Sequence, residues 1–166
     1  MWSHYADSHK GFVLEFNPHH SFFDRRKKPN QIAEHLKQVR YSIKRPELIL
    51  YNDNLSQTQR TDNLVKNFLW VKSKHWAYEQ EWRIITTLNR SDKTLKHSKL
   101  PIHLFKFPQS AIKSIYFGCK MEETTISKFI SLLNAKPCLN HIEIFQAYQN
   151  EKEYKLDFLK INTGNR

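Results

Sequence analysis

The sequence contains few of the residues that mark a disordered or disulfide-rich chain. Only 3 of its 166 residues are glycine, 6 are proline and 2 are cysteine. So few glycines and prolines argue against disorder and low complexity. Cys119 and Cys138 form no C-x-x-C pair. This argues against a disulfide framework and a four-thiolate zinc site, and it fits a reducing cytoplasm.

Long hydrophobic runs and familiar catalytic motifs are also absent. No apolar run approaches the ~20 residues that span a bilayer, and the polar residues 1–11 do not form a signal peptide. The dinucleotide-binding, P-loop and hydrolase glycine motifs do not occur. His4 and His9 are five residues apart, which is not the spacing of a metal-binding pair on one helical face. We therefore expect a soluble cytoplasmic protein with no membrane partner and no metal site.

Positive charge is abundant. Lys and Arg number 27 against 16 Asp and Glu, a formal net charge of +11. Such a field favours nucleotides or nucleic acid as partners, although a compositional bias of the source genome gives the same balance. Four consecutive cations are candidates for phosphate or nucleic-acid contact, or form a solvated loop: Arg25, Arg26, Lys27 and Lys28.

Hydrophobic periodicity predicts a mixture of strands and helices. Alternating patterns predict strands at 12–16, 39–43, 79–85, 102–107, 112–117, 142–148 and 154–161. Helical spacing predicts helices at 1–9, 30–36, 62–72 and 122–133. The last two strands form an antiparallel hairpin around the turn at 150–153. The fold class is therefore α+β, a single domain over residues 1–166. We expect a mixed or mainly antiparallel sheet of about six strands with three or four helices.

The stretch 76–85 holds the densest group of aromatic and ionisable residues. If it is extended from residue 79, then Glu79, Glu81 and Arg83 share one face of the strand. A carboxylate fixed there can stabilise the positive charge that develops on a sugar ring when its glycosidic bond breaks. A second carboxylate can orient the nucleophile. The alternative is a structural ion pair of Glu81 with Arg83 or Lys74.

The first residues offer a second candidate surface. Trp2 and Tyr5 are spaced to share a helical face, with His4 beside them. They are either core residues or a stacking surface for a purine or nicotinamide ring, with His4 or Tyr5 contacting a sugar hydroxyl.

Two segments resemble the signatures of a bacterial family, the domain of unknown function 2971. Residues 2–11 match W-s-H-Y-A-x-x-H-x-G, and residues 76–83 match W-x-Y-E-x-E-[WY]-R. Residues 39–41 and 115–118 match weaker landmarks in the same order. Family members usually carry an earlier segment with an N-D-P motif. We expect this chain to correspond to the larger C-terminal part of the family domain, without that segment.

A looser resemblance indicates an activity. Residues 79–81 are similar to the Glu-x-Glu motif of ADP-ribosyltransferases, mixed α/β proteins that use NAD. The resemblance implies an ADP-ribosyltransferase-like architecture and an NAD-using domain of a toxin or defence system, inactive if the absent segment is essential. Glu81 would be catalytic and Glu79 would orient the acceptor. The implied NAD-binding residues are Trp2, His4, Tyr5, Tyr78 and Arg83. The alternative is a basic nucleic-acid-binding module without catalytic activity, with Trp2, Tyr5 and Trp82 as stacking platforms.

Overall fold

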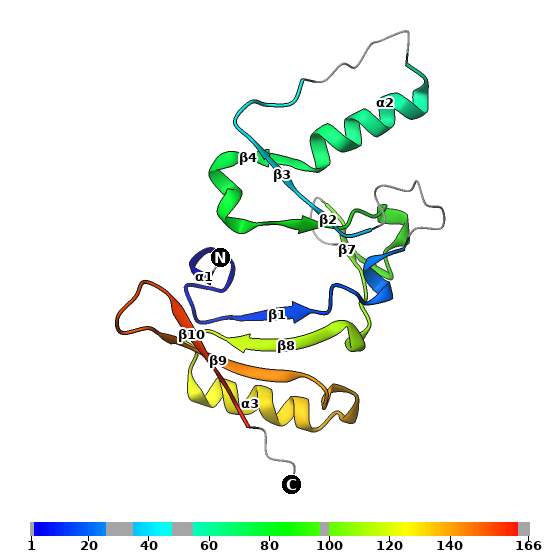
Figure 1. Cartoon of the computed structure of the whole chain (residues 1–166). Coiled ribbons are helices and arrows are strands. Elements are labelled where there is room, and N and C mark those ends of the chain that lie inside the picture. The colour runs from blue at the N-terminus through cyan, green and yellow to red at the C-terminus, as the bar shows by residue number, and fades with distance from the viewer. Residues whose placement is uncertain (1, 26–34, 48–54, 97–99, 163–166) are drawn as a thin grey trace. The chain divides into compact units, whose positions relative to one another are not determined.

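The computed structural model describes residues 2–25, 35–47, 55–96 and 100–162 (Figure 1). The chain divides into two compact units. The first comprises Met1–His20 and Phe107–Arg166, and the second is Ser21–Lys106. Helices and a mixed sheet confirm the α+β class. The single domain over residues 1–166 stays a prediction, and the helix expected at 30–36 lies almost wholly outside the described residues.

The first unit is built on a four-stranded sheet in the order β1-β8-β9-β10. Its strands are β1 (Phe12–Phe16), β8 (Ile112–Phe117), β9 (Glu143–Gln149) and β10 (Leu156–Lys160). β1 is antiparallel to β8, β8 is parallel to β9, and β9 is antiparallel to β10. The strands predicted at 12–16 and 112–117 are confirmed, and so is the C-terminal hairpin.

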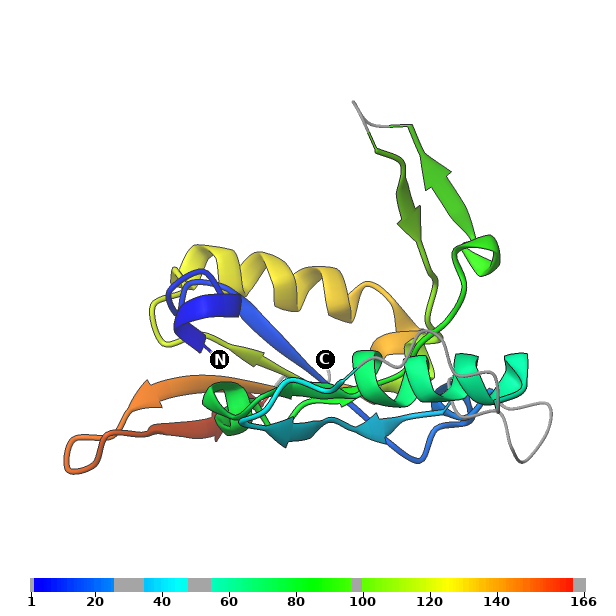
Figure 2. The ribbon, with the colours of Figure 1, turned by 90° about the horizontal axis from the view of Figure 1, so that it is seen from above.

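Helix α3 (Glu123–Asn134) covers one face of this sheet (Figure 2). Glu123 lies in the first helical turn, where a carboxylate is favoured by the helix dipole. The helix packs its apolar stripe against a core that includes Ile115, Phe117 and Ile144. The Phe129 ring lies 5.7 Å from that of Phe117. The predicted helix over 122–133 is confirmed.

The helix predicted at residues 1–9 is much shorter, because α1 covers only Trp2–Tyr5. The next residues turn the wrong way for a right-handed helix: Asp7, Ser8 and His9 have φ values of 45°, 51° and 71°. The His9 carbonyl accepts a hydrogen bond from the Lys120 N–H (3.0 Å). Contacts with a distant segment therefore override the local helical pattern.

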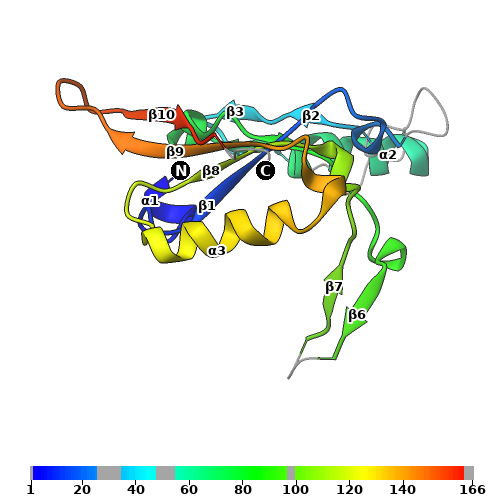
Figure 3. The ribbon, with the colours of Figure 1, turned by 90° about the horizontal axis from the view of Figure 1, so that it is seen from below.

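The second unit is built from short strand pairs. They are β2 (Lys37–Gln38) antiparallel to β5 (Trp82–Arg83), β3 (Arg40–Ser42) parallel to β4 (Val71–Ser73), and β6 (Lys93–Leu95) antiparallel to β7 (Ile102–Leu104). The β6–β7 pair extends away from the rest of its unit (Figure 3). Trp70, which lies between α2 and β4 in the chain, is the most buried large side chain among the described residues of this unit, at 2% exposure.

Two predictions for this unit are corrected. The helix expected at 62–72 begins earlier: α2 (Gln57–Leu64) is capped by Ser56 through a capping box, continues as a π-helix over Val65–Leu69, and gives way to β4. The strand expected at 79–85 is only Trp82–Arg83. A 3₁₀ helix, Lys74–Glu79, precedes it, and Gln80 is left-handed with φ 47°. Pairing of β4 with β3 and of β5 with β2 decides these segments, rather than their local alternation.

Candidate functional site

The second unit brings Glu79, Glu81 and Arg83 together around Lys72. The Lys72 ammonium donates hydrogen bonds to both carboxylates, to Glu79 Oε2 and, at 3.0 Å, to Glu81 Oε2. Glu79 ends the 3₁₀ helix, whereas Glu81 directly precedes β5, so the left-handed residue Gln80 lies between them. The two carboxylates therefore meet at one lysine, although they do not share the face of a continuous strand.

The Arg83 guanidinium binds the Glu81 carboxylate through two hydrogen bonds, in a bidentate ion pair. Its Nε donates to Glu81 Oε1, and its Nη2 donates to Oε2 at 3.0 Å. Its Nη1 donates to the Leu69 carbonyl at 2.7 Å, which ties β5 to the end of the preceding helical segment. Bidentate arginine–carboxylate pairs are geometrically specific. The predicted structural alternative, a Glu81–Arg83 ion pair, is thus confirmed, while the lysine at Glu81 is Lys72 and not Lys74.

The backbone of Glu81 is held as firmly as its side chain. Its N–H donates to the Tyr41 hydroxyl at 2.7 Å, and its carbonyl accepts from the Val39 N–H at 2.8 Å. Val39 is itself buried, at 3% exposure. Because Tyr41 belongs to β3 and Lys72 to β4, the β3–β4 and β2–β5 pairs together fix the position of Glu81.

These contacts keep the site ionised. Hydrogen bonding to Arg83 lowers the pKa of Glu81 below its ordinary value, and burial only partly opposes this shift. Hydrogen bonding to Glu79 raises the pKa of Lys72, and hydrogen bonding to Glu81 raises that of Arg83. The Glu79 side chain is 8% exposed and that of Glu81 is 27% exposed. Glu81 is therefore a fixed carboxylate that solvent still reaches.

Exposed aromatic residues lie next to the members of the ionic cluster in the chain. Trp76 and Tyr78 have ring centroids 6.1 Å apart and are 42% and 58% exposed. The Lys72 ammonium lies 5.0 Å from the Trp76 ring centroid, a cation–π contact. Tyr78, a predicted binding residue, thus has an accessible ring within a few residues of Glu81. Trp82 is 56% exposed, and the alternation of a strand places it on the opposite face from Arg83.

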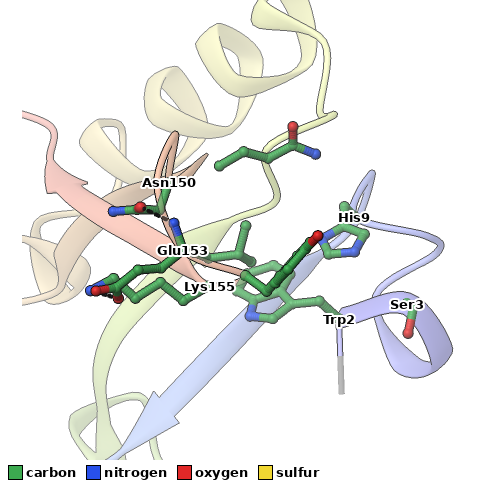
Figure 4. Close-up of a pocket in the computed structure, with 9 residues that line it drawn as sticks. Trp2, Ser3, His9, Asn150, Glu153 and Lys155 are labelled. Atoms are coloured by element: carbon green, nitrogen blue, oxygen red, sulfur yellow. Dashed lines mark hydrogen bonds and ion pairs between the residues drawn. The ribbon is translucent and has the colours of Figure 1, made fainter.

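The remaining predicted residues lie elsewhere. Trp2, His4 and Tyr5 belong to the first unit. There Trp2 lines a pocket with His9 (Figure 4), whereas His4 and Tyr5 are exposed and do not line it. Of the basic run, Arg25 stacks on the Phe22 ring at 3.8 Å and donates to the Phe22 carbonyl. Arg26, Lys27 and Lys28 lie outside the described residues.

Sequence reasoning missed Lys72 and Tyr41, which complete the cluster, and His9, which faces Trp2. The helix predicted over 62–72 places Lys72 at a helix end, and a helical Lys72 gives no indication of its contact with Glu81. The only signal for Tyr41 was its place in a weak family landmark. His9 lies in the first family signature, but its left-handed backbone cannot be read from periodicity.

The comparisons with known proteins identify a family but no activity. Residues 1–84 match the model of the family described as a protein of unknown function (DUF2971). The chain therefore belongs to this family. No curated protein matches it, and no solved structure matches it. The resemblance to ADP-ribosyltransferases, in motif and in architecture, stays a prediction.

In residues 2–25, 35–47, 55–96 and 100–162, no group of three or more His, Cys, Asp and Glu side chains is arranged to hold a metal ion. Within the same ranges, every helix is too short or too polar to traverse a bilayer.

Proposed function

We propose that this chain is an NAD-using, ADP-ribosyltransferase-like domain in which Glu81 is the catalytic carboxylate. The observation that carries the proposal is the state of Glu81: ionised, held by Arg83 and Lys72, and still 27% exposed. A carboxylate fixed in advance stabilises developing positive charge without reorganising during the reaction. NAD as substrate also fits the cytoplasmic location predicted from the sequence.

The proposed chemistry is cleavage of the bond between nicotinamide and ribose. Nicotinamide leaves as a neutral ring and takes the bonding electrons, so positive charge develops at the ribose C1 and ring oxygen. The Glu81 carboxylate stabilises that charge. An acceptor hydroxyl, amine or water then forms the new bond to C1 and loses its proton to solvent. Glu79, on the same lysine, orients the acceptor.

The groups next to Glu81 are suited to bind the diphosphate and the aromatic rings of NAD. Arg83 is 30% exposed, and a guanidinium binds a diphosphate through paired hydrogen bonds. The accessible Tyr78 ring offers a stacking surface for a nicotinamide or adenine ring. Trp2, His4 and Tyr5, predicted as NAD contacts from the resemblance, belong to the first unit, and the proposal does not rely on them.

The test is NAD turnover by the unaltered chain and three variants. Glu81→Gln keeps the shape of the side chain and removes its charge, so we expect nicotinamide release to fall about 100-fold or more. Glu79→Gln should slow transfer to an acceptor more than it slows hydrolysis. Glu15→Gln is the matched control, because Glu15 also accepts from a lysine (Lys113, 2.7 Å) and also has a lowered pKa, but lies in the other unit. No release by the folded wild-type chain would overturn the proposal.

Nucleic-acid binding is the second candidate, and the observation that favours it is the exposure of Trp76, Tyr78 and Trp82 in a chain of net charge +11. This function requires affinity for single-stranded DNA or RNA that falls steeply with added salt. It also requires the affinity to drop in Trp82→Ala and to be unaffected by Glu81→Gln. Salt-insensitive or absent binding would exclude it.

A further inference from the structure

A pocket of about 650 Å³ lies in the first unit, between the N-terminal segment and the β9–β10 turn (Figure 4). Its principal lining residues are Trp2, Ser3, His9, Glu153, Tyr154 and Lys155. The Trp2 and His9 rings are nearly parallel, with an interplanar angle of 7° and centroids 6.4 Å apart. The Trp2 ring also lies 6.1 Å from that of Phe158 in β10. The pocket therefore has flat aromatic walls and polar groups at its rim.

The backbone that delivers His9 is strained. Three consecutive residues without glycine, Asp7, Ser8 and His9, adopt left-handed φ values. Such conformations are costly and gather at ligand sites. Contacts with a distant segment hold this conformation in place. The His9 carbonyl accepts a hydrogen bond from the Lys120 N–H, and a Cβ built on Gly118 would lie 2.0 Å from the His9 carbonyl oxygen. This backbone conformation thus places the His9 imidazole at the pocket, and its buried Nδ1 has no hydrogen-bond partner among the described residues.

The opposite wall is the β9–β10 turn, which Asn150 organises. The Asn150 Oδ1 accepts from the N–H groups of Lys152 (2.8 Å) and Glu153 (2.7 Å), and its Nδ2 donates to Asp157 Oδ2 (2.7 Å). The turn presents Glu153 and Lys155 together, with Lys155 Nζ 2.6 Å from Glu153 Oε2. These two side chains are 63% and 52% exposed, so both can reach a ligand.

We propose that this pocket binds a nucleoside 5′-monophosphate. The base stacks on the indole of Trp2 beside the imidazole of His9, as bases do on aromatic side chains. The ribose hydroxyls donate to the Glu153 carboxylate, and the phosphate binds the Lys155 ammonium. The adjacent carboxylate and ammonium match the order of ribose and phosphate along the nucleotide. This site does not rest on NAD cleavage at Glu81, since every residue that forms it belongs to the first unit.

The test is calorimetric titration of the full chain with AMP and with adenosine. We expect AMP to bind more tightly than adenosine, and Lys155→Ala to remove that preference while leaving adenosine binding intact. Loss of the stacking surface in Trp2→Ala should weaken both ligands by about 5- to 150-fold, the equivalent of the stacking energy of one base. Glu153→Gln should weaken both because a carboxylate accepts hydroxyls more strongly than an amide does.

The controls separate binding from folding. Lys152→Ala and Glu151→Gln alter the same turn at exposed positions that do not line the pocket, and they should leave both affinities unchanged. Because Lys155 and Glu153 are exposed, their variants retain the fold even if Trp2→Ala does not. Absence of AMP binding at millimolar concentration would overturn the proposal. So would AMP binding that Lys155→Ala and Glu153→Gln leave unchanged. Neither result bears on NAD turnover at Glu81.

Discussion

Gly118→Ala should destabilise the first unit, because Gly118 packs directly against the strained N-terminal backbone. A Cβ at this position would lie 2.0 Å from the His9 carbonyl oxygen, 2.6 Å from its carbonyl carbon and 2.9 Å from the Gly11 oxygen. All three are backbone atoms, which no rotamer change can move aside. The substitution must push residues 9–11 away from the end of β8.

The expected loss of stability follows from the backbone hydrogen bonds that this displacement breaks. Two backbone hydrogen bonds span the contact, Gly118 N–H to the Gly11 carbonyl (2.9 Å) and Lys120 N–H to the His9 carbonyl (3.0 Å). Each contributes about 1 kcal/mol net. Forcing an extra methyl into a packed site adds about 1–3 kcal/mol. Gly118→Ala should therefore lower the free energy of unfolding by about 3–5 kcal/mol, from the sum of the two lost hydrogen bonds and the overpacking.

Urea unfolding followed by far-ultraviolet circular dichroism measures this cost. With a slope of about 2 kcal/mol per molar urea, the midpoint should fall by about 1.5–2.5 M. Gly11→Ala is the matched control, since its Cβ would approach only to 3.0 Å of the Ala6 carbonyl oxygen and should cost less. A Gly118→Ala midpoint equal to that of the wild type, or above that of Gly11→Ala, would refute the close approach.

The other predictions concern the contacts of Glu81 in the second unit and the packing of sheet and helix in the first. Tyr41→Phe removes the acceptor of the Glu81 N–H and should cost about 1 kcal/mol in urea unfolding. Hydrogen bonding to Arg83 lowers the pKa of Glu81 in the folded state. The ionised Glu81 therefore contributes its full stabilisation of the fold at pH values above the ordinary pKa of 4.5, and this contribution is lost as the pH falls through the lowered pKa of the folded state. Unfolding midpoints measured from pH 6 to pH 3 should thus fall less in Glu81→Gln. Phe117→Ala, at a fully buried position, should cost about 3–5 kcal/mol. Leu132→Ala, at a 64% exposed position, should change stability by no more than about 0.5 kcal/mol.

The sequence predicted the elements in which local pattern and burial agree. The strand Phe12–Phe16 ends before Asn-Pro, and the strand Ile112–Phe117 contributes Ile112, Ile115 and Phe117 to the core against which α3 packs. Helix α3 has both acidic residues at its start and an apolar stripe. In each of these elements the residues that predict the structure lie within the element itself, so local sequence was sufficient to predict it.

The predictions failed where a distant contact decides the backbone. The helical spacing of Trp2 and Tyr5 predicted a helix through His9, but the His9 carbonyl is held by the Lys120 N–H. At the candidate site, the spacing of Glu81 and Arg83 correctly predicted an ion pair. The role of Lys72 could not be predicted, because it depends on where the preceding helix ends and on the reversal at Gln80.

The role of Glu81 is tested by the amount of nicotinamide released from NAD by the unaltered chain, assayed beside Glu81→Gln at equal concentration. We expect release that is time-dependent and proportional to protein, and that falls about 100-fold or more in a variant whose far-ultraviolet spectrum is unchanged. Release that is absent, or that is equal in the folded variant, would contradict the role of Glu81. The ionic cluster around Lys72 would then be a structural element alone.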